Sequence, residues 1–268
     1  MPISPPLIVL VHGLMVSDAL TQTPVDPVAY WADIPSAIRS ALGDSVEVVT
    51  LALPAAGSVA ERAQALANLL AAATARQDRE IHLLTHSMGA LDARRAITTL
   101  GWGPSRGVRS LTTIGGPHLG SPVADLAVAV GGWALDWLAS HGWDDQAAYN
   151  LTTEFCCEFN EATPDVAGVA YRYVAGAFSP AVGSVWDLPY AYCAVHGGPN
   201  DGLVAVESAL RGGTPASGSV LWWETNHADE LSQFPPPFGD GESHAERWVE
   251  LVRTAVGVKG LWNEIDSF

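Results

Sequence analysis

The sequence predicts an α/β fold in which a mostly parallel central sheet is flanked by helices, and three observations lead to it. A continuous branched run, Leu7 to Val11, is typical of a strand buried on both faces of a parallel sheet. Ser58 and Glu61 form a capping box before the Ala- and Leu-rich stretch Arg62 to Ala75, which predicts a crossover helix. A second apolar run, Ile81 to Leu84, then completes a strand–helix–strand unit.

The length and composition favour a single domain over residues 1–268. The chain has 268 residues, 48% hydrophobic and only 16% charged, so it can bury a large core and carries no tract typical of disorder. Lys and Arg number 13 against 29 Asp and Glu, which gives a formal net charge of -16. This charge argues against nucleic acid and against electrostatic docking on anionic membranes, and favours a neutral or apolar substrate.

Two features bear on the cellular compartment. No apolar segment reaches membrane-spanning length, and no basic region with a cleavage site precedes the first strand, so neither a transmembrane segment nor a signal peptide is visible. A cytosolic protein, export by another route and a mature form all stay open. The three cysteines, Cys156, Cys157 and Cys193, allow at most one disulfide bridge, and we favour the interpretation that they are small buried residues.

The remaining elements follow from periodicity and from turn residues. Helices are expected over Ala90 to Leu100 and Leu151 to Asn160, and strands over Val108 to Ile114, Val169 to Val174, Tyr190 to Val195 and Ser219 to Glu224. Ser243 and Glu246 form a second capping box, which predicts a closing helix that ends at about Val256.

Residues 119–163 are expected to form a helical insertion within the domain. A helical pattern from Ser121 to Ala139 carries Trp133 and Trp137 one turn apart, with Trp143 soon after. One interpretation is a buried helix face. The other is a mobile lid, whose apolar side covers a lipid-like substrate site when closed and meets an oil surface when open. Periodicity alone does not separate the two.

The five residues Thr85 to Gly89 have the pattern of a nucleophile elbow, a sharp strand-to-helix turn that presents a catalytic serine beside a base. Ser87 is therefore the candidate nucleophile. Thr85 stands where the common G-x-S-x-G pattern has its first glycine, so the rest of the chain must supply the context. Downstream, Asp201 and then His227 complete the order serine, aspartate, histidine that this elbow requires in an α/β hydrolase.

These residue types define the chemistry that we expect. His227 would take the Ser87 proton and return it to a leaving alcohol, while Asp201 would fix the imidazole tautomer and stabilise its cation. Upstream, His12-Gly13-Leu14 ends the first strand, and a glycine there lets a backbone N–H turn toward an oxyanion. His12, His86 and His118 are expected to serve local hydrogen bonding, and His244 is a reserve base.

With these motifs, and with Thr112 to Ser121 and Asn226 to Gln233, the chain resembles the bacterial true lipases of the Pseudomonas, Burkholderia and Proteus group over nearly its full length. The resemblance implies an α/β-hydrolase fold in which Ser87, Asp201 and His227 are catalytic. It also implies that the backbone N–H groups of Leu14 and Met88 form the oxyanion hole.

The same resemblance implies a calcium ion near the histidine loop. Its protein ligands would be the carboxylates of Asp187 and Asp229 and the carbonyls of Gln233 and Pro237, a mixed oxygen set that calcium accepts in flexible geometry. The alternative is that Asp229 is a surface charge and Asp187 a turn residue. No organic cofactor is expected.

The hypothesis that results is a serine carboxylic ester hydrolase, a lipase that cleaves triacylglycerols or other apolar acyl esters through an acyl-enzyme. Such an enzyme would work at a lipid–water interface. Two alternatives stay open: a short-chain esterase or polyester depolymerase with the same triad, and a catalytically silent hydrolase-fold binding protein. Chain-length preference and interfacial activation would separate a lipase from an esterase.

Overall fold

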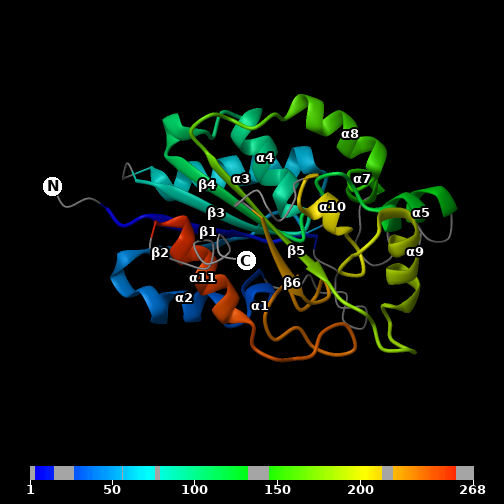
Figure 1. Ribbon diagram of the computed structural model, residues 1–268. Coiled ribbons are helices and arrows are strands. Elements are labelled where there is room, and N and C mark those ends of the chain that lie inside the picture. Colours follow the sequence, from blue (N-terminus) through cyan, green and yellow to red (C-terminus); the bar gives the residue numbers. More distant parts are fainter. Residues whose placement is uncertain are drawn as a thin grey trace.

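The computed structural model of the protein describes residues 4–14, 27–55, 57–75, 79–131, 145–212 and 220–257, and its centre is a twisted sheet (Figure 1). The strand order is β2-β1-β3-β4-β5-β6, and every neighbouring pair is parallel. The predicted mostly parallel sheet is thus confirmed. The strands are β1 Leu7–Val11, β2 Glu47–Leu51, β3 Ile81–His86, β4 Val108–Ile114, β5 Ala170–Ala177 and β6 Val220–Glu224.

Helices cover both faces of the sheet (Figure 1). One face carries α2 and α11, which pack against each other, and the opposite face carries the packed pair α3 and α4. The helix bounds are α1 Pro27–Trp31, α2 Ile34–Leu42, α3 Val59–Thr74, α4 Gly89–Thr98, α5 Pro122–Val130, α7 Asp145–Tyr149, α8 Thr153–Ala162, α9 Asp187–Gly197, α10 Val206–Ala209 and α11 Ala245–Ala255.

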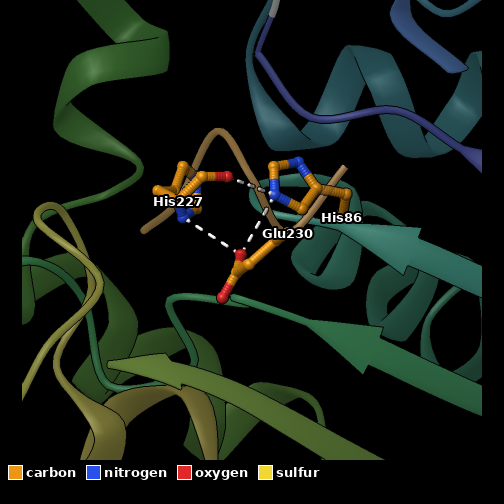
Figure 2. A group of neighbouring side chains, drawn as sticks. All are labelled: His86, His227 and Glu230. Atoms are coloured by element: carbon orange, nitrogen blue, oxygen red, sulfur yellow. Dashed lines mark hydrogen bonds and ion pairs between the residues drawn. The ribbon is translucent and has the colours of Figure 1, made fainter. Parts of the chain in front are cut away.

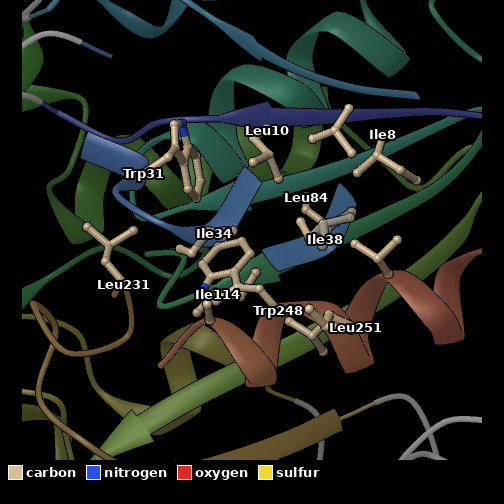
Figure 3. Packing of buried hydrophobic residues seen from close by; sticks show 14 of the residues in the cluster. Ile8, Leu10, Trp31, Ile34, Ile38, Leu84, Ile114, Leu231, Trp248 and Leu251 are labelled. Carbon is tan, nitrogen blue, oxygen red and sulfur yellow. The ribbon is translucent and has the colours of Figure 1, made fainter. Parts of the chain in front are cut away.

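Strand β1 is buried on both faces because successive side chains of a strand point to opposite sides. Ile8 and Leu10 belong to the core cluster beneath α2 and α11, where Trp31 and Trp248 meet edge to face with ring centroids 5.0 Å apart (Figure 3). Leu7, Val9 and Val11 belong to the cluster beneath α3 and α4. The continuous branched run of the sequence is explained by this double burial.

The predicted capping box at the start of α3 is confirmed. Ser58 Oγ accepts a hydrogen bond from the Glu61 N–H at 3.3 Å, and Glu61 Oε2 accepts one from the Ser58 N–H at 3.0 Å. Two donors that the first turn of a helix would otherwise leave unpaired are satisfied in this way.

One predicted strand is wrong. The stretch Tyr190 to Val195 lies within helix α9, which begins at Asp187, has Pro189 in its first turn and is followed by Gly198 with φ of 82°. An acid and a proline near the first turn and a glycine just past the end are helix-boundary signals. They outweigh the aromatic and β-branched content that favoured a strand, and α9 packs against α5 rather than into the sheet.

The second predicted capping box is also wrong. The hydroxyl of Ser243 donates to Asp33 Oδ2 at 2.6 Å, and His244 occupies the N-cap position of α11 without a capping side-chain hydrogen bond. The serine is therefore used to tie the start of α11 to the residue before α2, so it does not satisfy the N–H groups of its own helix.

The described parts of the insertion at 119–163 are the helices α5, α7 and α8. Ser121 caps α5 by accepting from the N–H groups of Val123 and Ala124. The predicted tryptophans Trp133, Trp137 and Trp143 lie outside the described residues, so the lid interpretation stays a prediction.

The three cysteines are free thiols. Cys156 and Cys193 are buried, as expected, whereas Cys157 is exposed, which differs from the predicted burial of all three. No helix among the described residues is both long and apolar enough to span a bilayer.

Candidate active site

The nucleophile elbow lies where β3 ends and α4 begins. Ser87 adopts φ of 55°, in the left-handed region that non-glycine residues rarely occupy, and its side chain is partly exposed. Its N–H donates to the Ile114 carbonyl at 2.9 Å, so pairing with β4 continues into the turn. Thr85 is fully buried within the sheet, in register with Val11 and Thr113, and a threonine is therefore accommodated where the common motif has glycine.

Ser87, His227 and Asp201 are brought together from three separate loops. His227 Nε2 lies 3.0 Å from Ser87 Oγ, and His227 Nδ1 lies 2.8 Å from Asp201 Oδ2. The second carboxylate oxygen of Asp201 accepts the N–H groups of Leu203 and Val204 at 2.8 and 2.7 Å. These bonds leave the fully buried carboxylate with one orientation, in which Oδ2 faces the imidazole.

Burial and charge act in opposite directions on the pKa values of this pair. Burial raises the pKa of Asp201, and the neighbouring His227 works against that rise. Burial alone would lower the pKa of His227, but the carboxylates of Asp201 and Glu230 outweigh it, so the pKa of the imidazole is raised. The surroundings therefore favour the imidazolium that forms when the base accepts a proton.

Glu230 is a site residue that the sequence reasoning missed. Its Oε2 lies 3.3 Å from Nδ1 of His227 and 3.1 Å from Nε2 of His86, and the three side chains face one another (Figure 2). Two glycines make the room, because an added Cβ would lie 1.9 Å from Oε2 at Gly115 and 2.6 Å from Oε1 at Gly176. A glutamate three residues after the histidine, with glycines at neighbouring strand ends, is the signal that could have found it.

The loop after β1 lies directly against the elbow. Val11 is in register with Thr85, and a Cβ added to Gly13 would come within 2.7 Å of the Ser87 Cβ, so only glycine allows this approach. We call His12, Gly13 and Leu14 the oxyanion loop. The N–H groups of Leu14 and of Met88 are engaged by no hydrogen bond to the residues that the structure describes.

A buried arginine, Arg62, binds the carbonyl groups of the oxyanion loop. Arg62 Nη2 donates to the carbonyls of His12 and Gly13 at 2.7 and 3.1 Å, and the Nδ1–H of His12 donates to the Gly13 carbonyl at 2.7 Å. Because a trans peptide opposes its N–H to its C=O, this contact turns the Leu14 N–H away from Arg62. The sequence placed Arg62 on a helix without indicating this contact.

Arg62 is itself held by Asp92 in a fully buried ion pair, with Nε 2.8 Å from Oδ2. Burial raises the pKa of Asp92 to about 6, against the opposing effect of the Arg62 charge. Burial, reinforced by the same arginine, lowers the pKa of His12 to about 4. His12 is therefore neutral at pH 7, and its Nε2 accepts the Leu53 N–H at 3.0 Å.

His118 makes the kind of local hydrogen bond that we predicted for it, whereas the predicted reserve base His244 contacts an aspartate. His118 is fully buried and its Nε2 lies 2.9 Å from Thr113 Oγ1. His244 pairs with Asp240 at 3.1 Å, and no contact in the described part of the chain joins it to Ser87.

The predicted calcium ligands lie in two segments that touch. The Trp186 indole N–H donates to the Phe238 carbonyl at 2.8 Å, so the start of α9, with Asp187, rests against the loop that contains Gln233 and Pro237. Asp187 Oδ2 accepts the N–H of Gly183 at 2.7 Å. Gln233 has φ of 54° and its N–H donates to the carbonyl of Glu242.

Asp229 is the predicted ligand whose surroundings best suit a cation. Its Oδ1 accepts the Asp240 N–H at 2.9 Å and its Oδ2 accepts the Asn226 amide at 2.6 Å, so each oxygen keeps a further acceptor position. Ligand atoms of Asp229, Asp240 and His244 lie within 4.8 Å of one another, and this group among the described residues does not include Asp187.

The parallel sheet, the elbow and the order of the three loops define an α/β-hydrolase fold, and solved structures agree. Mature lipase BlEst2 of Bacillus licheniformis matches with a TM-score of 0.65 and 24% identity over 85% of this chain and 86% of that one. Lipase 1 of Pelosinus fermentans matches with a TM-score of 0.62 and 17% identity over 96% and 99% of the two chains.

Sequence comparison adds one relative. Triacylglycerol lipase 2 of Saccharomyces cerevisiae is 30% identical over 220 residues, which are 77% of this chain and 66% of the yeast protein. The chain thus spans just under two thirds of that relative. No protein-family model matches the chain. None of these three proteins comes from the Pseudomonas, Burkholderia and Proteus group, so that narrower grouping stays a prediction.

Proposed function

We propose that the protein is a serine carboxylic ester hydrolase of the lipase type. The observation that carries this proposal is the hydrogen-bonded line from Ser87 Oγ through His227 to Asp201, at 3.0 and 2.8 Å. A partly exposed serine hydroxyl, a base within reach and a buried carboxylate behind the base are the parts needed for nucleophilic acyl transfer.

The reaction would proceed in two halves. His227 takes the proton as Ser87 Oγ attacks the ester carbonyl, and it then gives that proton to the leaving alcohol, which produces an acyl-enzyme. Water, activated by the same imidazole, releases the acid. The N–H groups of Leu14 and Met88 would stabilise the oxyanion of each tetrahedral intermediate, and each donor of this kind is worth about 2.7 to 4 kcal/mol.

The substrate class follows from charge and from the relatives. A formal net charge of -16 disfavours anionic small molecules and anionic polymers as substrates. The yeast relative is named a triacylglycerol lipase, and the two structural neighbours are named lipases. We therefore assign apolar acyl esters, triacylglycerols in particular, presented at a lipid–water interface.

Hydrolysis of p-nitrophenyl esters with short to long acyl chains tests the assignment. Wild type should cleave long-chain esters, Ser87→Ala should lose all hydrolysis, and the matched control Ser36→Ala, an exposed serine on α2, should behave as wild type. Activity confined to short esters would favour the esterase alternative. Unaltered hydrolysis in Ser87→Ala would exclude the mechanism, and no hydrolysis by wild type would favour the silent binding protein.

A structural calcium ion is part of the proposal. Asp229 would hold it together with the carbonyls of Gln233 and Pro237, and the second carboxylate would come from Asp187 or from Asp240, whose backbone N–H already bonds Asp229. Such an ion would fix the loop that carries His227, so its contribution is to the position of the base.

A further inference from the structure

We propose that Tyr30 and His86 are positioning residues, which hold the oxyanion loop and the histidine loop in register through one directed hydrogen-bond chain. The inference rests on the proposed ester-hydrolase mechanism and adds two residues to Ser87, His227 and Asp201. Tyr30 lies on α1 and His86 is the last residue of β3, so the chain joins segments that are remote in sequence.

The hydrogen-bond chain begins at the oxyanion loop. The Gly13 N–H donates to Tyr30 Oη at 3.0 Å, and Tyr30 Oη lies 2.6 Å from Nδ1 of His86. On its other side, Nε2 of His86 lies 3.1 Å from Glu230 Oε2 and 3.2 Å from the carbonyl of His227 (Figure 2). All of these side chains are buried.

Only one arrangement of protons satisfies this chain. The backbone N–H of Gly13 can only donate, so the Tyr30 hydroxyl accepts from it and directs its own single proton to His86 Nδ1. The imidazole must then carry its proton on Nε2, where a carboxylate and a carbonyl both accept. Burial lowers the pKa of His86 well below its usual value and raises that of Tyr30, which keeps the imidazole neutral and the phenol protonated.

The chain has two consequences for the reacting groups. It engages the Gly13 N–H with the Tyr30 hydroxyl, so the oxyanion donor of this loop is the next N–H, that of Leu14. It also fixes Glu230, whose Oε2 reaches the nitrogen of His227 that faces Asp201. A shift of Tyr30 would thereby displace both the oxyanion donor, the Leu14 N–H, and the base, His227. Efficient catalysis requires these two groups to be aligned with the reacting atoms within a fraction of an ångström.

Tyr30→Phe removes one oxygen and breaks the chain in its middle. The matched control is Tyr171→Phe. The Tyr171 hydroxyl likewise accepts a backbone N–H, that of Val166 at 3.1 Å, but Tyr171 lies on β5 and takes no part in the hydrogen-bond chain. We expect kcat for an ester to fall about tenfold to a hundredfold in Tyr30→Phe with KM nearly unchanged. The control should stay within about twofold of wild type.

Affinity for an alkyl boronic acid separates positioning from general destabilisation. The tetrahedral boronate resembles the transition state, so its inhibition constant should rise in Tyr30→Phe by the same factor by which kcat/KM falls. A purely structural role would lower the melting temperature and leave the inhibition constant of the folded fraction unchanged. A Tyr30→Phe protein with kcat/KM and boronate affinity within about twofold of wild type would overturn the proposal.

A second pair of variants keeps the test decisive if Tyr30→Phe does not fold. His86→Gln retains an acceptor and a donor, whereas His86→Leu retains neither. The glutamine variant should keep more activity than the leucine variant, and equal activity in the two would contradict the chain. If wild type hydrolyses no ester, the proposed function fails, and the role of Tyr30 and His86 fails with it. Hydrolysis that depends on Ser87 but not on Tyr30 overturns this inference alone.

Discussion

Glu230 Oε2 lies 3.3 Å from Nδ1 of His227, the same nitrogen that faces Asp201 at 2.8 Å. Two buried carboxylates therefore share one imidazole, and both raise its pKa. In the proposed mechanism the base must be neutral to accept the serine proton, so this arrangement would delay the onset of activity to higher pH while it would stabilise the imidazolium in the transition state.

Replacing Glu230 by Gln should move the acidic limb of the kcat/KM profile to lower pH. Removal of one carboxylate lowers the pKa of His227, so the imidazole loses its proton at a lower pH. The pH dependence of p-nitrophenyl ester hydrolysis measures the shift. Glu224→Gln, an exposed residue at the end of β6, changes the charge equally and should leave the limb in place. A limb that moves to higher pH in Glu230→Gln would contradict this interpretation.

Gly89→Ala, which adds one methyl group, should disable the nucleophile elbow. The new Cβ would lie 2.7 and 2.9 Å from the carbonyl oxygens of Val11 and His12, so the oxyanion loop and α4 must separate. A misplacement of this order costs about a hundredfold in rate, and we expect the loss in kcat. Gly103→Ala is the control, since its Cβ would meet a single side-chain atom at 3.4 Å. Steady-state kinetics measures kcat for both variants, and equal kcat values in the two would refute this prediction.

Arg62→Met should destabilise the fold strongly. It leaves Asp92 as a buried unpaired charge and frees two carbonyls of the oxyanion loop, and breaking a buried pair costs about 3 to 5 kcal/mol. Arg109→Met, which breaks an exposed pair with Glu80, should cost less than about 1 kcal/mol. Urea unfolding gives both values. The double variant with Asp92→Leu should recover part of the loss, and no recovery would show that the charge of Asp92 is not the cause.

Removal of calcium should lower the melting temperature. A cation that binds only the native state stabilises that state by mass action, so a chelator should lower the melting temperature. Asp229→Ala should lower the melting temperature to the same value, and the variant should not respond further to chelator. Asp44→Ala is the matched control, because Asp44 is an exposed aspartate in the short turn that follows α2. Calorimetric titration with calcium gives the affinity directly. Identical melting with saturating calcium and with chelator would exclude the site.

Local patterns predicted most of the sheet. Strand β4 has the predicted bounds, Val108 to Ile114, and the Ser58 capping box begins α3 as expected, because both depend on residues adjacent in sequence. The order of Ser87, Asp201 and His227 likewise follows from chain connectivity. Where local signals conflicted, as in the aromatic run Tyr190 to Val195, the helix boundaries decided the structure.

The residues that sequence reasoning missed depend on contacts between distant segments. Glu230 can be buried only because Gly115, directly after β4, and Gly176, on β5, leave space for its carboxylate. Arg62 has no motif of its own, and its role comes from carbonyls that lie 49 and 50 residues away. Such relationships follow from the packed tertiary structure and leave no periodic trace in the sequence.

Because every strand pairing is parallel, the sheet has two chemically unequal rims. The oxyanion loop, the elbow and the histidine loop all leave from the carboxyl ends of β1, β3 and β6. The opposite rim holds the turn Pro104–Arg106 before β4, and none of the groups assigned to ester cleavage. A protein engineer could therefore graft an affinity tag or a surface-immobilisation peptide into that turn, and the immobilised protein would keep the rim with Ser87 facing away from the support.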